Sequence, residues 1–160
     1  MNSVVIDASV VLKWYLLDEI LGEKALALLE NYYRDRIVLL APELLAYELA
    51  NGLVLAASRG RIPHEVVLDA LKGFWSLRIK LVDAGQIYER LPYLCRTHQL
   101  TAYDASYVAT AEIENAVLIT ADEKLHRAVK AGSGTAIRLG DLKIHDDNKI
   151  EWPDNGAPDD

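Results

Sequence analysis

Short runs of aliphatic and β-branched residues alternate along this chain with longer stretches in which apolar residues recur every three or four positions. The short runs are too brief for helices and predict buried strands at 3–6, 37–40, 80–82, 116–119 and 136–139. The longer stretches predict amphipathic helices that turn one apolar face to a core. Strands separated by helices favour a mostly parallel sheet covered on both faces, so we expect an α/β domain.

Four helical stretches stand out, at 25–32, at 45–56, from Pro63 to Trp75, and at 87–95, where Pro92 interrupts the pattern. Their apolar stripes have the spacing of core-facing positions. We therefore assign no cofactor role to Phe74, Trp75 or the tyrosines among them.

Length and composition narrow the class of protein. A chain of 160 residues can form one domain with a substantial core. A single cysteine excludes an internal disulfide and a thiolate cluster built from this chain alone. No run approaches the ~18 apolar residues of a membrane span, and the N-terminus lacks a signal-peptide pattern. We expect a cytoplasmic protein with no membrane association.

Acidic charge is concentrated at the C-terminus. The net charge is −7, and the segment 146–160 holds six carboxylates against one lysine. The rest of the chain is nearly neutral, which leaves room for a local basic patch. We predict a folded domain over 1–140 and an acidic, poorly ordered tail over 141–160, with Trp152 attaching the tail to the domain.

Common catalytic motifs are missing from the sequence. It contains no phosphate loop, no G-x-G-x-x-G after the first strand and no G-x-S-x-G nucleophile elbow. The Gly132-Ser133-Gly134 stretch follows a helix, where it reads as a helix stop. The four histidines are scattered without a His-x-x-x-His pair, so a histidine zinc site is not expected.

Four carboxylates remain as candidates. Asp7 directly ends the first predicted strand, and Asp122 follows the 116–119 strand closely. Both lie at the carboxyl ends of candidate parallel strands, where open α/β sheets bind ligands. Glu48 lies at the margin of an apolar helix face, and Asp104 opens a mostly apolar helix.

Each carboxylate also has a structural explanation. Asp7 and Asp122 could be helix N-caps, and Thr101 with Asp104 or Thr120 with Glu123 has capping-box spacing. Caps do not explain an acid at the edge of an apolar helix face. If the four converge, carboxylates ~4 Å apart repel by about 4 kcal/mol per pair at an effective dielectric of ~20, so a cation is required. Oxygen ligands favour Mg²⁺ or Mn²⁺.

At these residues the chain resembles the PIN domain, and in particular the toxin ribonucleases of VapBC toxin–antitoxin systems. The similarity lies in Val4-Val5-Ile6-Asp7-Ala8-Ser9, Tyr47-Glu48-Leu49-Ala50-Asn51, Tyr103-Asp104-Ala105-Ser106-Tyr107-Val108-Ala109 and Leu118-Ile119-Thr120-Ala121-Asp122. It implies a three-layer α/β/α sandwich around a parallel sheet. It also implies an endoribonuclease that depends on Mg²⁺ or Mn²⁺, acts on RNA, forms a homodimer and is held inactive by an antitoxin protein.

Individual residues of the chain match functional positions of the family. Asp7, Glu48, Asp104 and Asp122 match the family's acidic quartet, which holds the metal and carries catalysis. Thr120 matches a hydroxyl position near the metal, and Ser9 and Asn51 match positions that support the ligands. Basic residues are candidates for RNA phosphate contacts, with an ordinary solvated surface as the alternative. They are Lys13 on the helix after Asp7, Lys124, Arg127 and Lys130 on the helix after Asp122, and also Arg59 and Arg61.

Three other interpretations stay open. A phosphoryl-receiver protein would explain Asp7 or Asp122 but not Glu48 within a helix. A noncatalytic PIN-fold binding module would keep the fold without needing all four acids. An RNA-processing PIN nuclease would keep the activity and lack an antitoxin.

Overall fold

A five-stranded parallel sheet forms the centre of the protein. The computed structural model describes residues 2–131 and 135–152. The sheet has the order β3-β2-β1-β4-β5, and every neighbouring pair is parallel. Its strands are β1 (Asn2–Ile6), β2 (Ile37–Pro42), β3 (Lys80–Val82), β4 (Val117–Thr120) and β5 (Ala136–Arg138). The five predicted strands are thus confirmed, with shifts of one or two residues at their ends.

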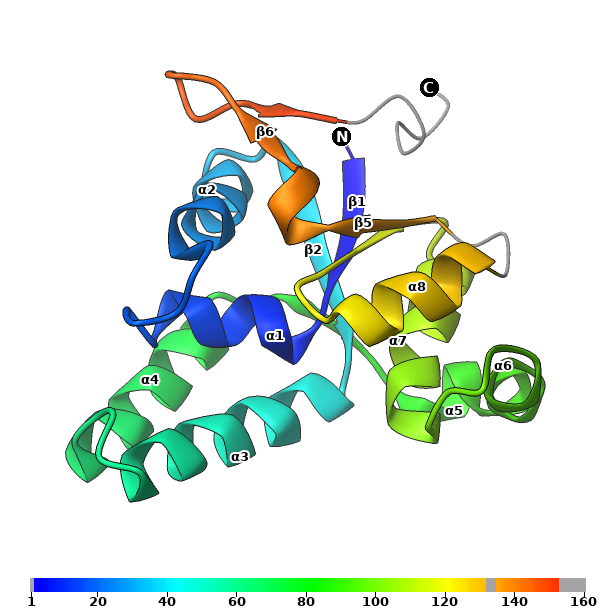
Figure 1. Cartoon of the computed structure of the whole chain (residues 1–160), viewed down its shortest axis with the longest axis horizontal. Helices are drawn as coiled ribbons and strands as arrows, with labels where there is room; N and C mark the ends of the chain where they lie inside the picture. Colours follow the sequence, from blue (N-terminus) through cyan, green and yellow to red (C-terminus); the bar gives the residue numbers. More distant parts are fainter. Residues whose placement is uncertain (1, 132–134, 153–160) are drawn as a thin grey trace.

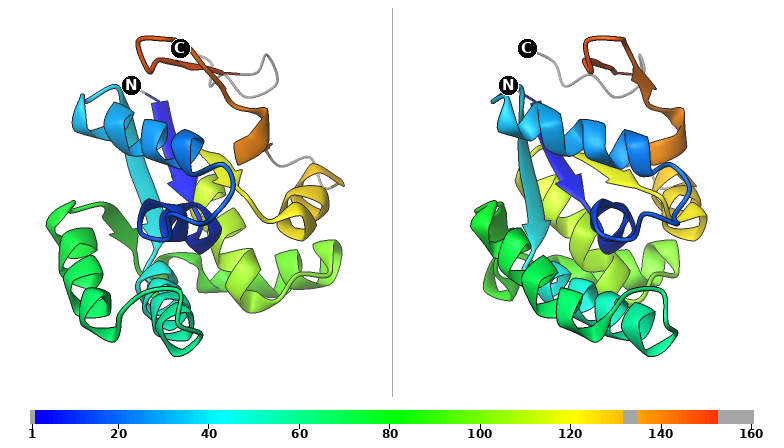
Figure 2. Two further views of the ribbon diagram at one scale, coloured as in Figure 1. Left: turned by 60° about the vertical axis from the view of Figure 1, so that its left-hand side comes forward. Right: turned by 90° about the vertical axis from the view of Figure 1, so that its left-hand side faces the viewer.

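Helices cover the sheet on both faces. The chain runs through α1 (Ala8–Val11), the 3₁₀ turn η1 (Leu12–Trp14), α2 (Gly22–Tyr33), α3 (Leu44–Ser58), α4 (His64–Ser76), α5 (Ala84–Ile87), η2 (Tyr88–Arg90), α6 (Leu91–His98), α7 (Ala102–Ile113) and α8 (Glu123–Ala131). Helix α2 lies across one face against β2, while α7 packs on β1, β2 and β4 from the other (Figures 1 and 2). This arrangement confirms the three-layer α/β/α sandwich.

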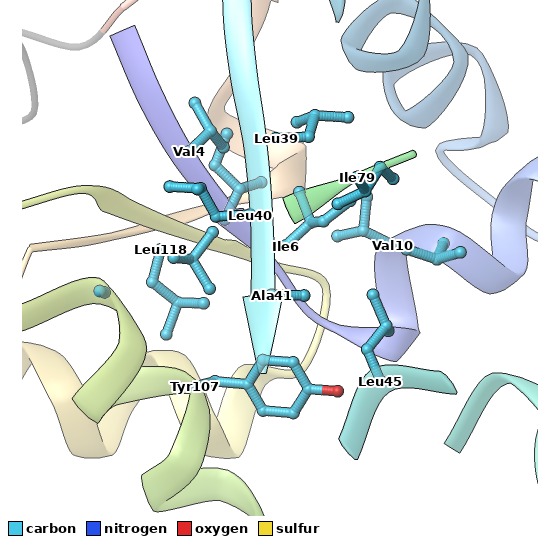
Figure 3. Close-up of a cluster of buried hydrophobic side chains, with 14 of the residues drawn as sticks. Val4, Ile6, Val10, Leu39, Leu40, Ala41, Leu45, Ile79, Tyr107 and Leu118 are labelled. Carbon is cyan, nitrogen blue, oxygen red and sulfur yellow. The ribbon is translucent and has the colours of Figure 1, made fainter. Parts of the chain in front are cut away.

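The core lies between these layers. Alternate and consecutive strand residues are buried because both faces of a parallel sheet are covered. Val4, Ile6, Leu39 and Leu118 are fully buried or nearly so, and the ring of Tyr107 packs with them at the carboxyl end of β2 (Figure 3). The apolar spacing that predicted α2 and α3 corresponds to the faces that these helices bury. In α4 the prediction is only partly correct, because Ala70 and Phe74 are buried whereas Trp75 is 59% exposed.

Strand order determines where the acidic residues meet. From β1 the chain moves to β2 on one side, whereas β4 pairs with β1 on the other side. The crossover connections therefore diverge between β1 and β4, which creates a crevice at the carboxyl ends of these two strands. Asp7 follows β1 directly, and Asp122 follows β4 by two residues.

The segment after β5 differs from the prediction. We expected a poorly ordered tail from residue 141, but the chain forms the 3₁₀ turn η3 (Leu139–Asp141) and an antiparallel hairpin of β6 (Lys143–Ile144) and β7 (Ile150–Glu151). The hairpin is attached to α2, because the side-chain amide of Asn31 donates to the Asn148 carbonyl at 2.7 Å. Lys24 on the same helix donates to the Leu142 carbonyl at 2.6 Å.

Apolar contacts hold the hairpin as well. Ile150 and Trp152 pack against the core, which confirms the predicted contact of Trp152 with the domain. Polar composition alone did not reveal the hairpin, because its anchors come from α2, more than 100 residues earlier. Residues 153–160 and the predicted helix stop at 132–134 lie outside the described residues, and the boundary at residue 140 stays a prediction.

Within the described part of the chain, no helix is both long and apolar enough to cross a membrane.

Candidate metal centre

Asp7 is the most buried of the four acidic candidates, with 5% of its surface exposed. It caps α1, as one interpretation of the sequence predicted, because its Oδ1 accepts from the backbone N–H of Val10 at 3.3 Å. Burial raises the pKa of its carboxyl from 3.8 to about 6, and the nearby negative charge of Asp122 adds to the rise. Capping does not need a buried charge, so the cap alone does not account for this position.

Two hydroxyl groups orient the Asp7 carboxylate. Ser9 Oγ donates to Asp7 Oδ1 and Thr120 Oγ1 donates to Asp7 Oδ2, each at 2.5 Å. Each hydroxyl oxygen also accepts a backbone N–H after β4: Ser9 from Ala121 and Thr120 from Asp122, both at 2.9 Å. These bonds join the ends of β1 and β4 and hold the carboxylate in one orientation. Ser9 and Thr120 therefore contact the predicted ligand directly.

Asp122 begins α8 beside this network. Its Oδ1 accepts from the backbone N–H groups of Lys124 at 2.8 Å and Leu125 at 3.1 Å, which is the N-cap geometry that the sequence allowed. The residue is exposed, unlike Asp7. Because its charge raises the pKa of Asp7, the two carboxylates form one electrostatically coupled pair.

Glu48 and Asp104 form a second pair, on α3 and α7. Burial raises the pKa of the half-buried Glu48, and the charge of Asp104 raises it further. The Tyr107 hydroxyl donates to Glu48 Oε2 and opposes that rise. Asp104 lies in the first turn of α7, where its backbone N–H donates to the capping hydroxyl of Thr101 at 3.1 Å. The predicted cap at Thr101 is therefore present, and the Asp104 carboxylate stays available.

A glycine permits the close approach of α3 to the segment after Asp7. A Cβ atom on Gly52 would lie 2.7 Å from Leu12 Cδ2, a separation that real side chains do not adopt. Helix α3 can therefore pack directly on η1. This contact places the helix that carries Glu48 next to the segment that follows Asp7.

No basic side chain neutralises these two carboxylate pairs. In residues 2–131 and 135–152, no lysine, arginine or histidine forms an ion pair with Asp7, Glu48, Asp104 or Asp122. The donors are all oxygens, which suit a hard divalent cation. No three acidic, histidine or cysteine side chains in the described ranges converge closely enough to hold a metal ion as they stand. Holding a cation through three carboxylates therefore requires side-chain rotation.

A comparison with protein families shows which family this chain belongs to. The model of the PIN domain family matches residues 4–131, which include all four acidic candidates, most of β1 and the strands β2 to β4. The chain belongs to the PIN domain family. The match ends before β5, so the C-terminal hairpin of this PIN domain lies outside the matched region.

Curated relatives of this PIN-domain chain carry the name ribonuclease. Ribonuclease VapC3 of Pyrobaculum aerophilum is 33% identical over 85 residues, which are 52% of this chain and 65% of that protein. Ribonuclease VapC9 of Mycobacterium tuberculosis is 38% identical over 84 residues, with the same two shares. The chain thus aligns with slightly less than two thirds of the length of these relatives.

Solved structures share the PIN fold. PAE2754 from Pyrobaculum aerophilum has a TM-score of 0.61 and 25% identity, over 87% of this chain and 85% of that one. VapC20 of Mycobacterium tuberculosis, a Sarcin-Ricin loop cleaving toxin, has a TM-score of 0.59 and 13% identity, over 84% and 98%. VapBC2 from Rickettsia felis, bound to a DNA fragment from its promoter, has a TM-score of 0.59 and 16% identity, over 85% and 98%. At 13% and 16% identity, the last two similarities show the fold alone.

Two residues outside the acidic quartet, Lys13 and Asn51, do not have the surroundings that their predicted roles require. Lys13 was a candidate for RNA phosphate contact, but it is only 6% exposed and its Nζ pairs with Glu19 Oε2 at 3.1 Å. The helical turn after Asp7 faces inward, so this side chain is not on the surface. Asn51 is exposed and, within the described residues, makes no hydrogen bond to the acidic quartet. Its predicted role beside Glu48 has no support in this arrangement.

The other basic candidates lie where RNA could reach them. Lys124, Arg127 and Lys130 are all exposed along α8, the helix that Asp122 begins. Their three-residue spacing predicted one side of a helix, and their shared exposure agrees with it. Arg59 is exposed at the end of α3, whereas Arg61 pairs with Asp18 and Glu19.

Tyr107 is the residue at this site to which sequence reasoning gave no role. It belongs to the quoted Tyr103–Ala109 stretch and lies three residues after Asp104 on α7, so the two share one side of the helix. That spacing is the only feature of the sequence that links Tyr107 to the site. The hydrogen bond to Glu48, 59 residues away, depends on how α3 and α7 pack.

Proposed function

We propose that this PIN domain is a divalent-metal-dependent endoribonuclease that hydrolyses RNA phosphodiester bonds. Two like-charged carboxylate pairs carry the proposal: Asp7 with Asp122 after β1 and β4, and Glu48 with Asp104 on α3 and α7. No basic side chain in the described residues forms an ion pair with any of the four. A cation relieves that repulsion. The ribonuclease names of the curated relatives support RNA as the substrate, although the alignments span 65% of those proteins.

The proposed cofactor is Mg²⁺ or Mn²⁺, held by Asp7, Glu48, Asp104 and Asp122. When bound, such a cation supplies a water nucleophile at neutral pH, an anchor for the phosphate and neutralisation of charge on the leaving oxygen. The chain's own contribution is orientation. Asp7 Oδ1 accepts from both Ser9 Oγ and the Val10 N–H, whereas Oδ2 accepts from Thr120 and keeps a further lone pair for a cation.

The RNA backbone needs cations from the protein as well. Lys124 and Arg127 are proposed for this role because both are exposed on the helix that starts at Asp122. Contacts of this kind fix the register of the strand but do not read its bases. Cleavage of cellular RNA would place the proposed activity in the cytoplasm.

We further propose that the protein is the toxin of a toxin–antitoxin pair, inhibited by an antitoxin protein and assembled as a homodimer. The resemblance to VapBC toxins supports the first part, and the solved VapBC2 relative bound to promoter DNA is consistent with it. A neighbouring reading frame for a small DNA-binding protein, whose product co-purifies with this chain, is the expected result. Sedimentation of the purified chain at the monomer mass would contradict the homodimer.

Cleavage of RNA tests the central proposal. Purified protein is incubated with a mixed, end-labelled RNA pool in Mn²⁺, Mg²⁺ or EDTA, alongside Asp104→Asn prepared identically. We expect metal-dependent fragments from the wild type and none from the variant. Equal cleavage by the two proteins would refute the assignment of the site. If a folded, antitoxin-free wild type cleaves nothing, calorimetric titration with Mn²⁺ decides between two explanations. A nuclease with a narrow choice of substrate still binds Mn²⁺, whereas a noncatalytic PIN module need not bind it.

A further inference from the structure

The Tyr107 side chain lies near one carboxylate of each pair, Glu48 and Asp7. Its ring is 2% exposed and packs among the core residues at the end of β2, with its hydroxyl oxygen directed toward α3 (Figure 3). The hydroxyl donates to Glu48 Oε2. The backbone amide of Ala8, the residue after Asp7, is a second group at the phenol oxygen. One side chain thus touches the segment of Asp7 and the side chain of Glu48.

The hydroxyl acts as a fixed donor. The phenol O–H donates to Glu48 Oε2, and an ionised carboxylate has no hydrogen to donate in return. The core packing of the ring leaves the oxygen little freedom to move. Glu48, by contrast, is half-buried on a flexible side chain, and no basic partner in the described residues holds it.

Packing alone does not require a hydroxyl at this position. A phenylalanine would fill the same core volume, and the phenol costs free energy when buried unless it is hydrogen-bonded. The Tyr107 hydroxyl donates to Oε2 of Glu48, so Oε1 does not accept from it. Hydrogen bonds of this kind set the direction in which a carboxylate presents its remaining oxygen.

We propose that Tyr107 is the positioning residue that orients Glu48 toward a divalent cation shared with the other carboxylates. The inference rests on the proposed metal-dependent function, which it deepens by naming how the α3 carboxylate is directed. Tyr107 does not touch substrate or cation in this scheme; it acts through Glu48. Loss of its hydroxyl releases Glu48 and weakens the site without emptying the core.

The test compares Tyr107→Phe with a matched control, Tyr32→Phe. Tyr32 is also partly buried, and its hydroxyl donates to the Leu77 carbonyl at 2.7 Å. It lies on α2, a helix that carries none of the four acidic candidates. Both variants lose one tyrosine hydrogen bond. Mn²⁺ affinity is measured by calorimetry in each folded protein, and urea unfolding in EDTA reports stability. We expect Tyr107→Phe to bind Mn²⁺ about 10–100-fold more weakly and Tyr32→Phe to match the wild type.

A double-mutant cycle shows whether Tyr107 acts through Glu48. In a Glu48→Gln background, Tyr107→Phe should cause little further loss of Mn²⁺ affinity, because the group that it orients is already changed. The same loss in both backgrounds, or an unchanged or raised affinity in the single variant, would overturn the inference and leave the proposed function standing. A wild type that binds no Mn²⁺ would overturn the proposed function and, with it, the role of Tyr107.

Discussion

Replacing Asp7 with asparagine should abolish cleavage and at the same time stabilise the metal-free protein at neutral pH. The buried carboxyl has a pKa of about 6, against 3.8 for the ordinary group. Each unit of difference corresponds to about 1.4 kcal/mol, so the ionised side chain costs the folded state about 3 kcal/mol. Asparagine has nearly the same shape and does not ionise, so it avoids this cost.

The pH dependence follows from the direction of the shift. Below pH 3.8 the carboxyl is protonated in both the folded and the unfolded chain, and it costs nothing. As pH rises from 3.8 to about 6, the unfolded chain releases its proton first, so the free energy of unfolding falls. Above that window the cost is constant. The cost of the wild-type carboxyl is about 1 kcal/mol at pH 4.5 and about 3 kcal/mol at pH 7.5.

Urea unfolding in EDTA at the two pH values measures this difference. Asparagine cannot accept from both Ser9 and Thr120 as the carboxylate does. The pH-dependent part of this difference is already contained in the pKa of Asp7, and the constant part cancels between the two pH values. We expect the stability of Asp7→Asn relative to wild type to rise by about 2 kcal/mol between pH 4.5 and 7.5. A relative stability that stays flat or falls toward neutral pH would refute the reasoning.

Mn²⁺ should reverse the order of stability. At 1,000 times its dissociation constant, a bound ion adds about 4.1 kcal/mol to the wild type, which exceeds the cost of about 3 kcal/mol from the buried carboxylate. The same concentration should leave the variant nearly unchanged, because the most buried ligand carries no charge. Equal stabilisation of both proteins by Mn²⁺ would show that the ion binds elsewhere.

Three further predictions address the hairpin, the core and the RNA surface. Asn31→Ala should cost about 1–2 kcal/mol in urea unfolding and speed proteolysis within 141–152, because the hairpin loses a buried donor; unchanged proteolysis would contradict this. Leu39→Ala should cost about 2–5 kcal/mol, against under about 0.5 kcal/mol for exposed Leu17→Ala, and a similar cost for both would argue against the core assignment. Lys124→Ala with Arg127→Ala should lower the slope of log affinity against log salt by about 1.4 for single-stranded RNA, whereas an unaltered slope would place phosphate contacts elsewhere.

Much of the fold and half of the site could be predicted from local patterns. Apolar runs such as 3–6 and 37–40 predicted strands, because covered parallel strands need apolar residues on both faces. Asp7 and Asp122 could be placed at one edge of the sheet, because the carboxyl ends of parallel strands meet there. Thr101 could be identified as a cap from the residues that follow it. Each of these inferences depends on neighbours within a few positions in the chain.

Contacts between distant segments were decided by tertiary packing. Thr120 donates a hydrogen bond to Asp7, 113 residues earlier in the sequence, and Tyr107 donates one to Glu48, 59 residues earlier. The apolar periodicity of the sequence does not indicate such pairs. The same packing buries Lys13 against Glu19 and folds part of the acidic tail onto α2. Helical and strand periods tell which side of an element is apolar, but the sheet order and the approach of α3 to η1 determine which polar groups meet. The amino-acid sequence therefore determined which residues are candidates for the chemistry, and the tertiary structure alone decided how those residues are paired and oriented.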